Sequence, residues 1–468
     1  MKRALRRVVL LLIAGLVTAC ATQGERAVAP ASLKPDRLAG VDAGTRVPDI
    51  NSRWWSAFND PQLDSLIDAA LAQSPSIDAA RARLESAAVV LRLTSNDRLP
   101  RSSFEASAGR QRLSASGLYP PPYAGATVNL GQLAVDLSYE IDFVGRVKAE
   151  VAAGAAGVAA ARYDLAATRL SLATAVARTY LDLARHYAVE ATLREAFARR
   201  SDLLQLTDQR ARAGLDTVLD VEEARASAAS VEADLAANAE EQILLRDELS
   251  ALVGAGPGLG AALVAPTASS IAAIAVPPML PADLIGRRPD VAAGRARLES
   301  AAADIKVAEA AFYPNLNLGG LLGFQSVEFG SLLGAGARIW NVGPALSLPL
   351  FATGRLRGQL AGRDASYSAA IASYNQAVVG AYREVADAVA SLRALEHEQA
   401  ASGVAASALE HAWQLATARY RAGLTGYVTV LVAEDKLLAQ RRIVVNLNAR
   451  RADLTVALFR ALGGGFTS

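Results

Sequence analysis

The stretch RARLESAA occurs twice in this chain, at residues 81–88 and again at residues 295–302. Later motifs recur in the same order: Leu99-Pro100 with Tyr313-Pro314, Gly145-Arg146 with Gly354-Arg355, and Arg212-Ala213-Gly214-Leu215 with Arg421-Ala422-Gly423-Leu424 (the RAGL motifs). The chain therefore contains a tandem repeat, with two copies of one structural unit. Two copies are too few for a solenoid, so the copies must complete each other or another chain.

The first twenty residues have the pattern of an export signal. Four basic residues precede an apolar run from Val8 to Val17, which is too short to span a membrane as a helix. The run leads into LVTAC, and Cys20 is the only cysteine of the chain. This resembles the bacterial lipoprotein signal, in which residues 1–19 are removed and the cysteine becomes the lipid-carrying first residue. Ala21, in place of an aspartate, implies sorting to the outer membrane, and a single cysteine excludes a disulfide.

Charge and hydropathy exclude two classes of protein. Without residues 1–19 the chain keeps 44 of its 48 basic residues against 46 acidic ones, so its charge does not attract nucleic acid. The remaining sequence has no uninterrupted apolar run of the roughly 18 residues that a membrane-spanning helix needs. Any membrane crossing must therefore use strands.

A long proline-free stretch before the first RAGL motif predicts a long helix. From about Lys148 to Arg212 helix-forming residues dominate, and large apolar residues recur at steps of seven and four positions. These residues are Leu165, Leu172, Val176 and Leu183. A continuous helix of this extent would be roughly 100 Å long; the alternative is two helices with a bend near Gly154 or Gly157.

Each RAGL motif is predicted to be the turn of a helical hairpin, because a glycine after a helical run is the usual left-handed stop. The next helix should begin near Asp216, its N-cap, and reach about Leu252, and Thr425 should cap the corresponding helix of the second copy. Both turns keep arginine and leucine around the glycine, which predicts a shared surface role. The residues concerned are Arg212, Gly214, Leu215, Arg421, Gly423 and Leu424.

The residues before each predicted long helix show a different spacing of apolar side chains. In GQLAVDLSYEIDF, residues 131–143, apolar and polar side chains alternate, which predicts a strand with one apolar and one polar, acidic face. The polar face carries Asp136, Ser138, Glu140 and Asp142. Weaker alternation follows Pro100, and the second copy alternates over residues 316–324 and 340–350. Such strands fit a transmembrane barrel or a half-buried soluble sheet.

The number of strands constrains any barrel. Four strands per chain are fewer than the roughly eight of the smallest closed barrels, and open sheet edges do not occur in lipid. If the strands span a membrane, several chains must share one barrel, with eight strands for a dimer or twelve for a trimer. The fold class is then α+β, with a shared membrane-spanning β-barrel continued by a long α-helical barrel and an internal tandem repeat.

Several motifs together resemble the outer membrane factor family of TolC-like export channels. They are Trp54-Trp55-Ser56-Ala57-Phe58-Asn59-Asp60-Pro61-Gln62-Leu63, Arg288-Pro289-Asp290-Val291, Phe312-Tyr313-Pro314 and the two RAGL motifs. The chain is most similar to the NodT-like lipoprotein branch, which serves efflux pumps of the resistance-nodulation-division (RND) type. The resemblance implies a homotrimer in outer membrane lipid that extends into the periplasm, with RAGL turns that meet a periplasmic adaptor (membrane fusion) protein.

The resemblance also implies a domain order. A signal peptide (1–19) precedes a lipidated segment that enters an equatorial belt (20–62), the first repeat (63–254), a belt linker (255–284), the second repeat (285–463) and a tail (464–468).

The family closes its periplasmic end just after the second turn, where an aspartate often follows a leucine pair. Here Val432 stands at the position of that aspartate. A ring of carboxylates would have to come from Glu434 or Asp435, on the next turn of the helix. The alternative is an apolar closure through Val428 and Val432.

The sequence contains no pattern typical of an enzyme. The three histidines lack a second ligand at helical spacing, and there is no phosphate-binding loop or nucleophile motif. No cofactor is expected, and a partner must supply the energy. The predicted function is a passive exit duct for drugs or other small toxic compounds, driven by an inner-membrane pump. The alternatives are a duct for protein secretion and a periplasmic coiled-coil structural lipoprotein.

Overall fold

The computed structural model describes residues 31–33, 41–42, 50–117, 119–266, 280–281, 286–349 and 351–467. The predicted signal peptide, Cys20 and parts of both predicted belt segments lie outside these residues. The chain divides into two compact units. Among the described residues, unit 1 comprises those within 31–32, Arg83–Ala161 and Gly294–Tyr374, and unit 2 those within Leu33–Ala82, Arg162–Ala293 and 375–467.

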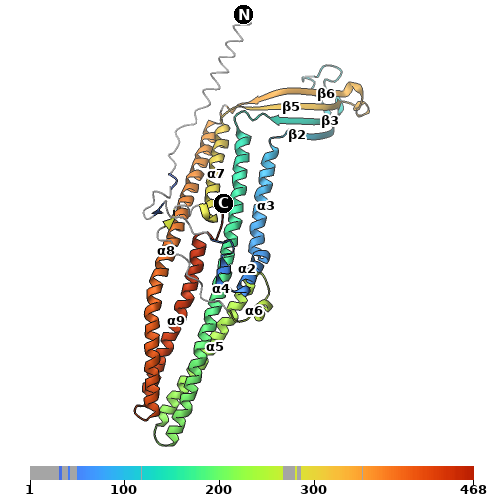
Figure 1. The fold of residues 1–468 in the computed structure, drawn as a ribbon. Helices are drawn as coiled ribbons and strands as arrows, with labels where there is room; N and C mark the ends of the chain where they lie inside the picture. Colours follow the sequence, from blue (N-terminus) through green and yellow to red (C-terminus); the bar gives the residue numbers. More distant parts are fainter. Residues whose placement is uncertain are drawn as a thin grey trace. The chain divides into compact units, whose positions relative to one another are not determined.

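The same order of elements, helix, two strands and two long helices, occurs twice along the chain (Figure 1). The first set is α3 (Pro75–Asn96), β2 (Arg101–Arg112), β3 (Thr127–Glu140), α4 (Arg146–Arg212) and α5 (Val218–Val253). The second set is α7 (Pro289–Ala310), β5 (Asn315–Ser326), β6 (Arg338–Ser347), α8 (Thr353–Arg421) and α9 (Tyr427–Ala461). Shorter elements are β1 (Val41–Asp42), η2 (Trp54–Phe58), α2 (Pro61–Gln73), α6 (Gly258–Ala262), β4 (Leu280–Pro281), η4 (Phe329–Ser331) and η5 (Ala335–Ala337).

The long helices run without a break. Helix α4 has 67 residues and α8 has 69, so the alternative of two helices with a bend near Gly154 or Gly157 is wrong. Both predicted N-caps are also wrong. Thr217 caps α5 in a capping box with Asp220, and Gly426 precedes α9 without a side-chain cap.

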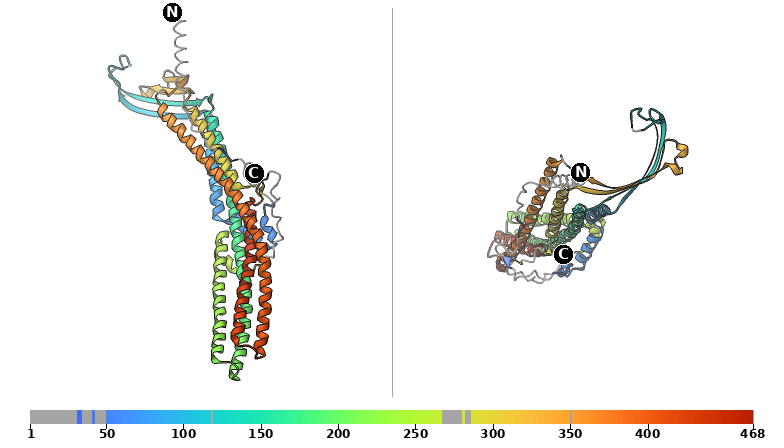
Figure 2. Two further views of the ribbon diagram at one scale, coloured as in Figure 1. Left: turned by 90° about the vertical axis from the view of Figure 1, so that its left-hand side faces the viewer. Right: turned by 90° about the horizontal axis from the view of Figure 1, so that it is seen from above.

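Unit 1 contains one antiparallel sheet in the order β2-β3-β5-β6 (Figures 1 and 2). Phe312 packs with Leu356 and Leu360 of α8 in a small apolar core beside the sheet. Ser300 of α7 donates a hydrogen bond to the carbonyl of Ala153 in α4 at 3.0 Å. Within the described residues, β2 and β6 are the edges of the sheet.

Unit 2 contains two helical hairpins, α4–α5 and α8–α9, whose turns lie at the same end (Figure 1). Near these turns a buried cluster takes side chains from all four helices: Leu203, Ala224, Ala416, Tyr420, Tyr427 and Val430. A larger core brings Trp54, Trp55 and Phe58 against α4, and Trp54 stacks on Phe459 with ring centres 5.2 Å apart.

Candidate functional site

The register of the sheet separates apolar from polar side chains on its two faces. Phe104 pairs with Val135, Val135 with Leu322, and Leu322 with Trp340, so one apolar row crosses all four strands. All four side chains are exposed, Phe104 by 69% and Trp340 by 77%. A contiguous exposed apolar face indicates contact with another apolar phase or another chain.

The opposite face carries three of the four predicted lumen residues, Asp136, Ser138 and Glu140. Asp136 pairs with Ser103 of β2 on one side and with Leu321 of β5 on the other, and Leu321 pairs with Asn341 of β6. Arg146 holds Glu140 with two hydrogen bonds of 2.9 and 2.6 Å, at the point where β3 leads into α4.

The assignment of Asp142 to this polar face is wrong. Strand β3 ends at Glu140, and the Asp142 carboxylate accepts a hydrogen bond from the backbone N–H of Lys148 at 2.8 Å. The alternation continues in the sequence, but the carboxylate satisfies a free N–H in the first turn of α4.

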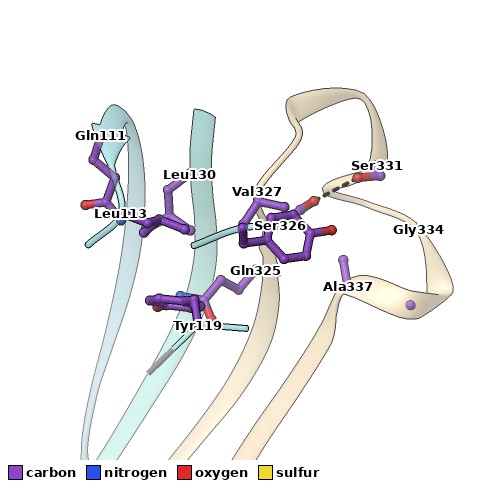
Figure 3. Close-up of a pocket in the computed structure, with 12 residues that line it drawn as sticks. Gln111, Leu113, Tyr119, Leu130, Gln325, Ser326, Val327, Ser331, Gly334 and Ala337 are labelled. Carbon is purple, nitrogen blue, oxygen red and sulfur yellow. Dashed lines mark hydrogen bonds between the residues drawn. The ribbon is translucent and has the colours of Figure 1, made fainter. Parts of the chain in front are cut away.

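The hairpin loops line a partly open pocket of about 430 Å³ (Figure 3), at the end of the sheet away from the helices (Figure 1). Its lining combines amides, hydroxyls and rings, and includes Gln111, Leu130, Gln325, Tyr119, Ser326 and Ser331. Gln111, Leu130 and Gln325 belong to the polar face by their register. The polar face therefore ends in an uncharged, partly aromatic recess.

Both RAGL motifs form the same backbone turn. Gly214 has φ +73° and Gly423 has φ +75°, values that side-chain-bearing residues rarely adopt. The N–H of Leu215 donates to the Arg210 carbonyl, and that of Leu424 to the Arg419 carbonyl, each at 2.9 Å. The N–H groups of Gly214 and Gly423 donate to the carbonyls three residues back. Together these two kinds of hydrogen bond define a Schellman turn.

The turns present apolar side chains to the outside. Leu215 is 66% exposed and Leu424 is 69% exposed, and Val218 and Leu219 beside the first turn are exposed to a similar degree. Arg212 is exposed and forms a 2.7 Å ion pair with Asp208 one turn back, and Arg421 is exposed as well. The six predicted tip residues thus surround two adjacent, largely uncovered turns.

The carboxylate of Asp216 joins the two hairpins behind these turns. Arg210 Nε donates to Asp216 Oδ2 at 2.9 Å, and the Tyr420 hydroxyl donates to the same oxygen. The Arg210 guanidinium also lies 4.7 Å from the centre of the Tyr420 ring. Burial alone would raise the pKa of Asp216, but the bonds from Arg210 and Tyr420 outweigh it and lower that pKa.

The predicted closure residues divide into two groups. Val428 and Val432 are 52% and 46% exposed on α9. Glu434 is 1% exposed and lies 3.4 Å from Arg199 and 3.7 Å from Arg200, so the proposal that its carboxylate closes a duct is wrong. Burial raises the pKa of Glu434, against the effect of the two arginines. Asp435 is exposed and accepts a hydrogen bond from Arg200.

The motifs at 54–63 and 288–291 serve as anchors within unit 2. Asp60 caps α2 and accepts a 2.8 Å hydrogen bond from the Tyr180 hydroxyl. Arg288 is buried, with ion pairs to Asp290 at 2.7 Å and Glu384 at 2.8 Å. Sequence reasoning missed these contacts, the Asp216–Tyr420 bond and the buried Glu434, because nothing in a sequence reports which helices become neighbours.

The described residues show neither a metal-binding cluster nor a membrane-spanning helix. No group of three or more histidine, cysteine, aspartate or glutamate side chains is placed to hold a metal ion. No helix in the described part of the chain combines the length and apolarity of a membrane span.

Comparison with known proteins gives consistent matches over nearly the whole chain. The family model described as outer membrane efflux protein matches residues 66–255 and again residues 280–464. Outer membrane protein OprJ of Pseudomonas aeruginosa is 32% identical over 97% of this chain and 95% of its own. The multidrug resistance outer membrane protein MdtP of Escherichia coli K12 is 29% identical over 99% and 98%. The crystal structure of the outer membrane protein VceC from Vibrio cholerae superimposes with a TM-score of 0.85 at 38% identity, covering 89% of this chain and all of that one.

Proposed function

The chain belongs to the outer membrane efflux protein family, and from that premise we propose that it is the passive exit duct for drugs or other small toxic compounds in a tripartite pump. It is an outer membrane efflux channel that extends into the periplasm. The observation that carries the proposal is the two-faced sheet, whose apolar row of Phe104, Val135, Leu322 and Trp340 backs a polar face. One face suits lipid and the other suits a water-filled lumen lined by Asp136, Ser138 and Glu140.

Three chains complete the barrel in this proposal. Strands β2 and β6 are edges of a four-stranded sheet, and edges left open in lipid would expose unpaired backbone groups. Pairing β6 of one chain with β2 of the next in a homotrimer gives twelve strands, enough for a lumen. The long hairpins of the three chains would continue the same tube, and the two tandem repeats would occupy equivalent places in its wall.

The paired hairpin turns are the proposed docking site for a periplasmic adaptor of an RND-type pump. Leu215 and Leu424 are exposed on turns of identical geometry at one end of unit 2. Exposed leucines on rigid turns provide apolar contacts at little entropic cost. Arg212 and Arg421 would add polar contacts at the rim.

We infer that the periplasmic closure is apolar. Val428 and Val432 are half exposed on one face of α9, while Glu434 is enclosed by arginines. The exposed Asp435 could contribute charge at the rim of that closure. At the N-terminus we propose removal of residues 1–19 and lipidation of Cys20, which would add a second membrane attachment. The belt (20–62 and 255–284), the repeats (63–254 and 285–463) and the tail (464–468) remain our proposed division of the chain.

The proposal assigns no catalysis to this chain, which is consistent with a family of channels. The name of MdtP refers to multidrug resistance, which favours small molecules over a protein as the cargo. A periplasmic coiled-coil lipoprotein would leave the apolar face of the sheet without a partner.

The test is the intracellular accumulation of a panel of dyes and antibiotics in cells with and without this chain, with secreted proteins profiled in parallel. We expect accumulation to rise on deletion while secretion is unchanged. Loss of a secreted protein without a change in accumulation would assign the duct to protein traffic. The Cys20→Ser variant should still require detergent; a soluble, monomeric variant would contradict a membrane barrel.

A further inference from the structure

Three arginines stand on the apolar face of the sheet, at its loop end. Strand β2 pairs with β3 without interruption from Arg101 to Arg112, so Arg110 and Arg112 point to the same side as Phe104. Strand β6 pairs with β5 without interruption from Arg338 onward, so Arg338 shares the side of Trp340. The apolar face therefore ends in positive charge rather than in more apolar residues.

The arginines begin where the large apolar side chains stop. Along β5 the apolar face runs from Leu316 to Phe324, eight steps along the strand or about 27 Å. A strand tilt of about 40° reduces this to roughly 21 Å of height, close to the apolar band of an outer membrane barrel. Arg338 pairs with Phe324 in the last apolar row, and Arg110 and Arg112 lie beyond that row.

These arginines are exposed and unpaired in the described part of the chain. Arg110, Arg112 and Arg338 are all exposed, and none of their side chains forms a hydrogen bond or an ion pair with a described residue. Other arginines near the sheet have partners: Arg101 binds Asp97, and Arg146 binds Glu140 and Glu150. The contrast sets the three arginines apart from those that stabilise the fold.

We propose that Arg110, Arg112 and Arg338 bind the phosphate-bearing head groups of lipid around the loop-end rim of the barrel. The inference rests on the proposed function, because it requires the apolar face to lie in a membrane. An arginine can lay its apolar stem on the end of the apolar band while its guanidinium reaches the head groups. A guanidinium also matches a phosphate with two parallel N–H donors.

Position favours a lipid over a free anion. The three arginines lie on the lipid side of the sheet, whereas the lumen side carries Asp136 and Glu140. They are also spread from β2 to β6, which are opposite edges of the sheet. If chains share a barrel, Arg338 of one chain approaches Arg110 of the next, and the arginines form a belt. Such a belt suits many lipids in a ring better than one small anion.

The test measures binding of diphosphoryl lipid A to the purified full chain in neutral detergent by native mass spectrometry. Each basic residue near an anionic lipid surface contributes roughly fivefold in affinity. We therefore expect Arg110→Gln/Arg112→Gln/Arg338→Gln to weaken lipid A binding by at least tenfold. The matched control is Arg83→Gln/Arg92→Gln/Arg98→Gln, which removes three exposed arginines from unit 1 away from this face and should leave the affinity within twofold.

Further arms identify the ligand chemistry. Monophosphoryl lipid A should bind the wild-type chain more weakly than the diphosphoryl form, and millimolar inorganic phosphate should leave lipid binding within twofold. Equal affinity of wild type and triple variant, or equal loss in the control variant, would overturn the proposal. Displacement of lipid A by inorganic phosphate would show a free-anion site in its place.

A separate measurement shows whether the apolar face is in the membrane at all. Brominated lipids quench the fluorescence of tryptophan side chains that lie in the membrane. The difference in quenching between wild type and Trp340→Phe reports the position of Trp340 and does not involve the arginines. Strong quenching with unchanged lipid A binding in the triple variant would reject only the arginine proposal. Absent quenching would reject the membrane barrel itself.

Discussion

Single residues break the sequence repeat where the two copies touch. With the offset that relates Gly214 to Gly423, Asp216 corresponds to Thr425 and Tyr420 to Ala211. Asp216 and Tyr420 nevertheless bind each other across the hairpins. The two copies thus keep the same turn but differ in the side chains that join them. A bond between two halves of one chain requires complementary rather than identical residues.

Asp216→Asn should destabilise the folded chain by about 1–3 kcal/mol, because it weakens charge-assisted hydrogen bonds from Arg210 and Tyr420. The folded pKa of Asp216 is lowered. The contribution of Asp216 to the free energy of unfolding is therefore complete above the unfolded aspartate pKa of about 3.9. It is lost as the pH falls through the lower pKa of the folded state. Thermal unfolding at several pH values measures this. The control Asp208→Asn removes an exposed pair with Arg212 and should cost less than about 1 kcal/mol.

Glu434→Ala should cost about 1–3 kcal/mol, because it removes a buried carboxylate from beside Arg199 and Arg200, while Arg200 keeps its hydrogen bond to Asp435. Denaturant unfolding checks the value. The control Glu398→Ala removes a half-exposed ion pair with Arg450. The free energy of unfolding should fall by no more than about 1 kcal/mol in this variant. Equal effects in the two variants would mean that burial does not set the importance of Glu434.

Among the elements, the hairpin turns are the most constrained. Both glycines have positive φ, and no atom outside the immediate backbone lies within 4 Å of a Cβ built at either position. Backbone conformation alone therefore requires glycine there. The exposed leucines that follow are held in fixed directions by the turn hydrogen bonds.

Gly423→Pro should abolish efflux while the assembled protein remains intact, because proline fixes φ near −65° and removes the N–H that bonds Tyr420. Gly423→Ala should cost about 1–2 kcal/mol and reduce efflux less. Efflux assays with size-exclusion analysis separate the two effects. Gly403→Ala, in the interior of α8 with free space around it, should be neutral or slightly stabilising. Normal efflux by Gly423→Pro would remove the docking role from the turns.

At the scale of the whole molecule, one chain leaves its apolar face and its strand edges uncovered. The sheet has four strands, and large apolar residues such as Trp340 are mostly exposed. A homotrimer in lipid satisfies both requirements, since neighbouring chains pair the edges and lipid covers the face.

Cysteines placed on the two edges test this arrangement. In membranes, a flexible bis-maleimide should link Ser103→Cys/Asn341→Cys chains, on β2 and β6, into products of two and three chains and none larger. The control Asp136→Cys/Leu321→Cys places both cysteines on central, paired strands and should link only within a chain. A ladder that stops at two chains would indicate a dimer, and single chains alone would contradict a shared barrel.

The sequence by itself determined the local features of this protein. Proline-free, helix-forming stretches predicted α4 nearly to its ends, the two glycines predicted the hairpin turns, and period-two alternation predicted β3 and its polar face. These features follow from backbone sterics and side-chain periodicity, which neighbouring residues settle among themselves. The family resemblance came from the same local motifs.

Only the tertiary structure decided which side chains meet. Asp142 looked like the next residue of a strand face, yet it satisfies a backbone N–H of α4. Glu434 was a candidate for a ring of carboxylates at the periplasmic closure, yet it is buried between Arg199 and Arg200 of another helix. The burial and pairing of a charge depend on residues hundreds of positions away. The pattern around each position fixes the direction of a side chain, but packing decides whether it meets water, lipid or an opposite charge.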